Sequence, residues 1–218
     1  MSRTRPDRPP TGRGASPWRT LEFASLDFEA TGLDFTRDRI ISFGVVPVQR
    51  GRIEVGRAVY QLVDPGEVPV SPESVTIHGL RPADLRGAPS VEAARETLGA
   101  AIGGRFLLTW WAGVEAGFLD ALFGGGVRAW RRRAVDVRQL VIALEGDPGR
   151  RLSLTQAAER FQVPVASPHH ALDDALVTAQ LFLVTATKLN TLGRGQLRDL
   201  LHPAPTSLPV LVRPRAPM

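Results

Sequence analysis

The order of the apolar segments constrains the fold of this 218-residue chain most. Three consecutive segments have the composition of β-strands, and after them strand-like and helix-like segments alternate. This order is typical of a mixed sheet with helices packed on it. We therefore predict an α/β fold with a mixed five-stranded sheet flanked by helices, the strands lying at residues 21–28, 40–48, 54–63, 105–111 and 133–137.

Capping residues mark where several helices begin. Ser71, Ser90 and Ser153 each precede a helix-like segment, and a serine there can accept a hydrogen bond from the first turn. The longest helix-like segment has apolar residues at helical spacing. We predict helices at residues 71–78, 90–102, 115–123, 138–144 and 153–161, and a segment at 169–188 that begins in a loop and continues as a long helix.

The two ends of the chain differ in composition from the part between them. Residues 1–19 form a basic, Pro- and Gly-rich segment with too few apolar residues to fold, and the chain is Pro-rich after Asn190. We expect a disordered tail at 1–19, the folded domain at 20–189 and an extended tail at 190–218. Either tail could tether the domain to a polymerase or another protein.

Composition excludes several kinds of site. The chain has no cysteine, so a bound metal must have oxygen or imidazole ligands, which suit Mg²⁺ or Mn²⁺. No apolar run reaches the roughly 18–20 residues that span a bilayer, and no secretory signal precedes the domain. These absences predict a cytoplasmic protein without a membrane partner. The net charge of +5 fits a polyanionic partner, although a GC-rich genome also encodes arginine-rich chains.

The first predicted strand carries two carboxylates, Asp27 and Glu29. Residues i and i+2 of a strand point to the same side, so the two acids would project together. Paired carboxylates are costly unless a cation lies between them, and a divalent metal removes that cost. The alternative is an exposed strand end with two solvated acids.

A histidine and an aspartate lie at the start of the last long helix. His169 in the loop and Asp174 on the first turn could face the strand that carries Asp27 and Glu29. They would supply a base that activates water and another metal ligand. Taken alone, this segment could also be a capped helix whose acids favour the helix dipole.

These motifs resemble those of the DEDDh branch of the DnaQ-like 3′–5′ exonucleases, which includes the proofreading ε subunit of bacterial DNA polymerase III. Residues 27–32 match the first family motif and residues 169–174 match the third, H-x-A-x-x-D. Residues 77–80 and 135–140 give weaker matches. The resemblance covers about residues 23–189 and implies a ribonuclease H-like fold.

The second family motif is altered in this chain. Matching Phe118 to the motif places Glu115 where the family has aspartate, and the usual His-Asn pair becomes Trp110-Trp111. We assign Glu115 as the third acid. Asp120, or no ligand at all, is the alternative.

The resemblance also implies a mechanism. Two ions, Mg²⁺ or Mn²⁺, would be held by Asp27, Glu29, Glu115 and Asp174, with Asp27 bridging both. His169 would take a proton from the attacking water, and neighbouring His170 is the rival base.

The implied substrate is the single-stranded 3′ end of DNA, held by Ala30, Thr31, Leu33 and His78. The tryptophan pair is expected in the core strand, with base stacking as the alternative. The Arg131–Arg133 loop is either solvated or a phosphate contact.

The resemblance implies an exonuclease of the proofreading or repair type that releases nucleoside monophosphates. The motifs do not separate DNA from RNA, so a 3′–5′ exoribonuclease is one alternative. The other is a weakened member that binds nucleic acid without cutting it, a reading that the altered second motif keeps open.

Overall fold

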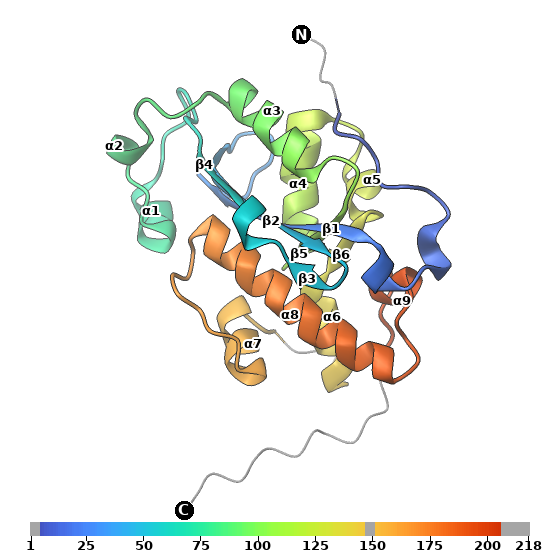
Figure 1. Cartoon of the computed structure of the whole chain (residues 1–218). Coiled ribbons are helices and arrows are strands. Elements are labelled where there is room, and N and C mark those ends of the chain that lie inside the picture. Colours follow the sequence, from blue (N-terminus) through green and yellow to red (C-terminus); the bar gives the residue numbers. More distant parts are fainter. Residues whose placement is uncertain (1–4, 147–150, 206–218) are drawn as a thin grey trace, which may run out of the picture.

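A mixed β-sheet forms the centre of the molecule in the computed structural model, which describes residues 5–146 and 151–205 (Figure 1). Within these residues it has six strands in the order β3-β2-β1-β5-β6, with β4 pairing with β2. Strand β1 is antiparallel to β2 and parallel to β5, which is parallel to β6. The strands are β1 (Glu22–Ala30), β2 (Ile40–Gln49), β3 (Arg52–Ile53), β4 (Val59–Leu62), β5 (Phe106–Thr109) and β6 (Ala134–Asp136).

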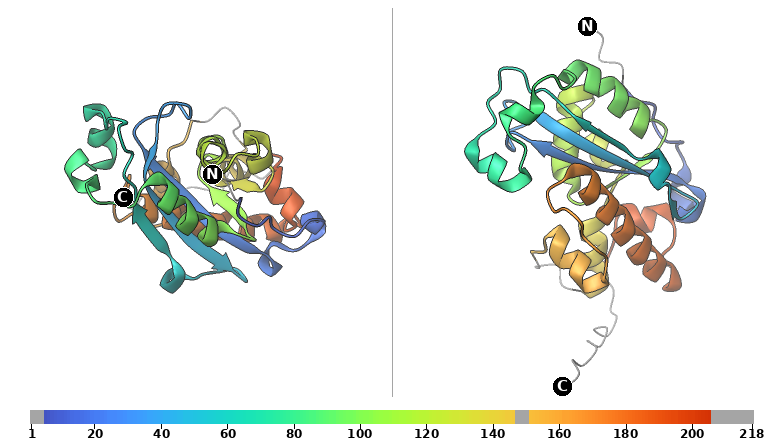
Figure 2. Two further views of the ribbon diagram at one scale, coloured as in Figure 1. Left: turned by 90° about the horizontal axis from the view of Figure 1, so that it is seen from above. Right: turned by 60° about the vertical axis from the view of Figure 1, so that its left-hand side comes forward.

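Helices cover both faces of this sheet, with α3 and α4 on one face and α8 on the other (Figure 2). This arrangement confirms the predicted α/β fold with a mixed sheet flanked by helices. The predicted caps Ser71, Ser90 and Ser153 also accept hydrogen bonds from their helices. The helices are α1 (Pro72–His78), α2 (Pro82–Leu85), α3 (Val91–Ile102), α4 (Ala112–Phe123), α5 (Val127–Arg131), α6 (Val137–Glu145), α7 (Leu154–Phe161), α8 (Ala171–Thr191) and α9 (Leu197–Leu201).

The two faces of β1 belong to two different cores. Phe23 packs in the core that α6, α7 and α8 complete, whereas Ala24 and Leu26 pack in the core beneath α3 and α4. Because side chains alternate along a strand, Asp27 and Glu29 lie on the same face as Phe23. The strand therefore directs both carboxylates toward the α8 face.

The predicted strand at residues 54–63 is wrong as a continuous strand. It is replaced by β3, a 3₁₀ turn at Val55–Arg57 and β4, all along the edge of β2. Pro47 in β2 accepts a hydrogen bond from Glu54 N, but it has no N–H to donate back to this edge. The missing donor interrupts the ladder between the two short strands.

Packed structure extends beyond residues 20–189 at both ends. Trp18 is 1% exposed, meets Phe182 edge-on at 5.3 Å and donates its backbone N–H to Gly195 O. In the segment expected to be extended, α9 buries Leu197 and Leu200. A few large apolar residues fix these segments although their composition is polar. Of the predicted tails, residues 1–4 and 206–218 lie outside the described residues.

The structure also bears on membrane insertion. Across residues 5–146 and 151–205, none of the helices combines the length and the apolar character that crossing a bilayer requires.

Candidate active site

The start of α8 lies directly against the strands that carry the predicted acids. Gly44 of β2 pairs with Asp27 of β1. A Cβ atom on Gly44 would stand 2.3 Å from Ala171 O and 2.4 Å from Leu172 Cα. Ser25 Oγ donates a 2.7 Å hydrogen bond to Ala175 O. A glycine in β2 and a short serine in β1 thus allow the first turns of α8 to approach the sheet.

This close approach brings three predicted site residues together. Ligand atoms of Glu29, His169 and Asp174 lie within 4.8 Å of one another. The pairing of β1 with β2 shifts register between Glu29 and Ala30, and such bulges often re-aim side chains beside active sites. The loop histidine, the helix aspartate and the strand glutamate therefore form one cluster.

His169 is held in an unusual backbone conformation. Its φ is +60°, in the left-handed region that non-glycine residues seldom adopt. Its backbone N–H donates to Asp174 Oδ2 at 3.1 Å, which ties the loop to the helix. The side chain is exposed, so it can reach water and substrate.

The rival histidine is engaged elsewhere. The ring of His170 stacks on Tyr60 of β4, with centroids 4.4 Å apart and planes at 27°. Its Nδ1 lies 3.8 Å from Asp173 Oδ2. His169, and not His170, belongs to the cluster with Glu29 and Asp174.

The candidates for the third acid point to different places. Glu115 lies on the first turn of α4, is 5% exposed, and adds to the negative potential at Asp27. Its Oε2 is buried without a hydrogen-bond partner among the described residues. Asp120 instead accepts a 2.7 Å hydrogen bond from Gly126 N at the other end of the helix.

Asp136 is a half-buried acid whose role sequence reasoning missed. Its Oδ2 accepts from Ala112 N at 3.1 Å and its Oδ1 from Gln139 N at 3.0 Å, so it caps both α4 and α6. The carboxylate lies close enough to Glu115 to raise the pKa of that acid. The sequence signal was an aspartate between a strand and a helix, a typical N-cap position.

Burial makes the cluster electrostatically costly. It is the main cause that raises the pKa values of Glu29 and Glu115, each to about 8. Burial first, and then the carboxylates of the other three acids, raise the pKa of Asp27. Burial also raises the pKa of Asp174. No arginine or lysine within the described ranges forms an ion pair with these four acids.

This arrangement fits divalent cations. The side-chain donors are carboxylate oxygens and an imidazole, which suit Mg²⁺ or Mn²⁺. A cation would give the partnerless Oε2 of Glu115 a partner and would offset the burial that raises the pKa of Glu29. The residues present therefore fit the metals that the motifs imply.

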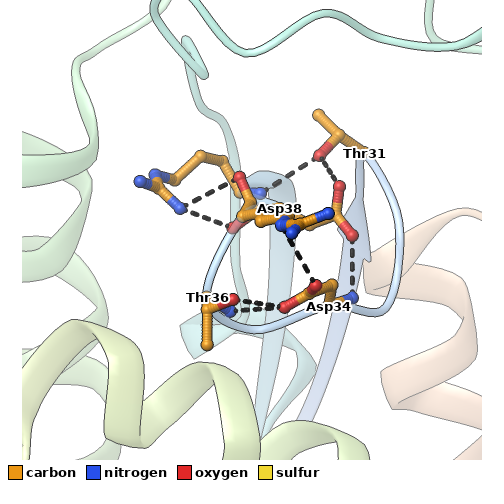
Figure 3. Close-up of polar contacts among 6 residues, drawn as sticks. Thr31, Asp34, Thr36 and Asp38 are labelled. Atoms are coloured by element: carbon orange, nitrogen blue, oxygen red, sulfur yellow. Dashed lines mark hydrogen bonds and ion pairs between the residues drawn. The ribbon is translucent and has the colours of Figure 1, made fainter.

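Three of the four expected nucleotide-binding residues, Ala30, Thr31 and Leu33, lie at the end of β1 and in its connection to β2. Thr31 Oγ1 donates to Asp38 Oδ1 at 2.9 Å (Figure 3). The backbone N–H of Thr31 donates to Arg39 O. Asp38 Oδ2 accepts from Asp34 N in the same network. The Thr31 amide and hydroxyl thus shape the loop.

Leu33 and His78 differ in exposure. Leu33 is 66% exposed, whereas His78 is half-buried, its Nδ1 accepting from Leu80 N at 3.0 Å. Burial and the charge of His169 lower the pKa of His78, which places the two imidazoles near each other. Ala30 is half-buried at the end of β1, beside Glu29.

The tryptophan pair is only partly in the core. Trp110 packs against the core of the α8 face, but Trp111 is 52% exposed at the N-cap of α4. The prediction that Trp111 lies in the core strand is wrong, because β5 ends at Thr109.

In the arginine loop, Arg133 is buried and donates to Ile102 O and Arg105 O, which excludes a phosphate contact for this residue.

Comparison with known proteins assigns the chain to a class. The RNase_T family model, described as "Exonuclease", matches residues 25–182. With the ribonuclease H-like fold, this match defines a nuclease. The chain belongs to this exonuclease family.

Two relatives illustrate the match. The chain is 31% identical over 197 residues to a PolC-type DNA polymerase III of Thermotoga petrophila; the match covers 85% of this chain but 13% of the polymerase. It is 28% identical over 163 residues to the DNA polymerase III subunit epsilon of Aquifex aeolicus, covering 74% of this chain and 78% of the subunit.

Solved structures share the fold. The nuclease domain of 3′hExo, a DEDDh family member bound to rAMP, superposes with a TM-score of 0.65 at 19% identity, covering 81% of this chain and 95% of that domain. E. coli exonuclease I in complex with a dT13 oligonucleotide gives a TM-score of 0.66 at 16% identity, covering 79% and 42% of the two chains.

Proposed function

We propose that this protein is a metal-dependent 3′–5′ exonuclease that hydrolyses single-stranded DNA and releases nucleoside monophosphates. The observation that carries the proposal is the cluster of Glu29, His169 and Asp174, whose ligand atoms lie within 4.8 Å of one another beside Asp27 and Glu115. Its relatives among DNA polymerase III proteins favour DNA and a polymerase as partner.

The acids provide the metal site in this mechanism. Asp27, Glu29, Glu115 and Asp174 would hold two ions, Mg²⁺ or Mn²⁺. When bound, such ions lower the pKa of water and stabilise the charge that develops on the phosphate oxygens. The low exposure of Glu29, Glu115 and Asp174 keeps these carboxylates away from competing water.

His169 acts as the general base. Its exposed imidazole accepts a proton from the water that attacks phosphorus, and later passes that proton to solvent. The hydrogen bond from His169 N to Asp174 Oδ2 keeps the loop next to the metal-binding acids. The P–O bond to the 3′ oxygen breaks, that oxygen takes a proton from solvent and becomes the new 3′ hydroxyl of the strand, and the phosphate leaves on the released nucleoside monophosphate.

The residues around the site would hold the terminal nucleotide. Exposed Leu33 offers an apolar contact, Ala30 follows Glu29 on β1, and His78 lies near His169. Thr31 acts through the loop, because its hydroxyl and amide are bonded to Asp38 and Arg39.

The test is the release of nucleotides from single-stranded DNA and RNA labelled at either end, with Mg²⁺, Mn²⁺ or EDTA. We expect stepwise shortening from the 3′ end of DNA, absent in EDTA and strongly reduced in His169→Ala. Faster degradation of RNA would favour the exoribonuclease alternative. Binding without cleavage under every metal would refute the catalytic proposal in favour of a nucleic-acid-binding module.

A further inference from the structure

An exposed tryptophan lies next to the candidate active site. Trp18 and Trp130 are 1% and 4% exposed, whereas Trp111 leaves 52% of its surface in solvent. Large aromatic side chains gain most when they are buried, so an exposed indole beside a site often serves binding.

The position of Trp111 is fixed by neighbouring contacts. It is the N-cap residue of α4, and the next backbone N–H, from Ala112, donates to Asp136 Oδ2 at 3.1 Å. Its indole lies over the start of the helix, where a Cβ on Gly113 would stand 3.6 Å from the indole nitrogen, and Glu115 lies on the same first turn. Trp111 and the third candidate acid therefore lie at the same end of α4.

A cation accompanies the indole. The guanidinium carbon of Arg138, on the first turn of α6, lies 5.7 Å from the centroid of the Trp111 ring. The backbone N–H of Arg138 donates to Trp110 O. The Nε atom of Arg138 is buried and has no hydrogen-bond partner among the described residues. That atom is closed to a ligand, but the half-buried guanidinium beside an exposed aromatic ring suits a ligand that has both an anionic group and a flat ring.

We propose that Trp111 is a stacking platform for one base of the substrate strand and that Arg138 binds an adjacent backbone phosphate. The inference rests on the proposed function, since it extends the same site toward its substrate. Stacking tolerates any base, because every base has a π face. The platform therefore selects an unpaired strand without reading its sequence.

Binding of a single-stranded oligothymidylate tests the platform directly. All variants carry His169→Ala, so that the DNA is not consumed in Mg²⁺, and binding is followed by fluorescence polarisation. We expect Trp111→Ala to weaken binding about 5- to 150-fold, the range that loss of one stacked base gives. Leu192→Ala, which removes an exposed apolar side chain at the end of α8, is the matched control.

Abasic substitution locates the base. A set of oligonucleotides carries one abasic residue each, placed at successive positions from the 3′ end. The His169→Ala protein with Trp111 intact should bind one of these oligonucleotides more weakly than the others. Trp111→Ala should bind that oligonucleotide and the intact one equally. Arg138→Ala should reduce the slope of log affinity against log salt by about 1. Arg52→Ala, on β3 at the opposite edge of the sheet, should leave it unchanged.

The outcomes separate the two proposals. If the wild-type chain cleaves nothing, the proposed function fails, but the binding comparison still decides the role of Trp111. If Trp111→Ala keeps both the affinity and the abasic profile of its parent, the stacking platform is refuted even for an active exonuclease.

Discussion

Gly44→Ala should separate the first turn of α8 from the sheet. The added Cβ would lie 2.3 Å from Ala171 O and 2.4 Å from Leu172 Cα, and both atoms belong to backbone. Ordinary contact begins near 3.4 Å, so the helix start must move by about 1 Å. A shift of that size at a catalytic group can cost about 100-fold in rate. Asp174 and His169 sit on the segment that must move.

Stability should fall as well. Overpacking of this kind costs about 1–3 kcal/mol, which lowers Tm by about 2–12 °C in a chain of this size. Thermal unfolding and kcat on single-stranded DNA measure the two effects. Gly56→Ala is the control, since its Cβ meets nothing within 4 Å and its φ is not positive. Both quantities should stay unchanged there.

One result would refute this reasoning: Gly44→Ala with wild-type kcat and Tm. A lowered Tm with unchanged kcat would show that the contact supports the fold without positioning the site. If Gly44→Ala does not fold, Ser25→Ala gives a milder test, because it removes the 2.7 Å hydrogen bond to Ala175 O without a clash.

Three further predictions concern the acids. Glu115→Ala should abolish cleavage and Asp120→Ala should leave kcat unchanged, because the Asp120 carboxylate bonds Gly126 N; equal losses would contradict the assignment. In EDTA, the pKa of Glu29, raised from 4.5 to about 8, makes the folded state bind more protons than the unfolded state, so Tm should fall as pH rises from 4.5 to 8. Glu29→Gln should flatten this Tm–pH profile. An unaltered slope would show that Glu29 does not cause the fall in Tm. Asp136→Ala should lose about 1–3 kcal/mol of stability in urea unfolding, because two helix starts lose their cap; a cost near zero would refute this.

Local sequence patterns predicted much of the fold and the separate parts of the site. Strand periodicity put Asp27 and Glu29 on one face, and capping serines located three helices. Spacing within one segment paired His169 with Asp174, and their hydrogen bond lies within that segment. These features depend on neighbours in sequence, which a single chain displays.

The remaining features depend on contacts between distant segments. The role of Gly44 appears only when α8 is placed on β2, although a lone glycine in a strand is a signal for close backbone approach. The burial of Trp18 needs Phe182 and α9, and the double cap of Asp136 needs α4. Trp111 was expected in the core because strand β5 was expected to continue to it.

The most direct test of the central claim is calorimetric titration of Mn²⁺ into the intact protein and into Asp27→Asn, with hydrolysis of single-stranded DNA measured on the same samples. We predict two Mn²⁺ ions per chain and hydrolysis for the wild type, with fewer ions bound and no hydrolysis for Asp27→Asn. Equal Mn²⁺ binding and equal hydrolysis by the two proteins would contradict the proposed metal site.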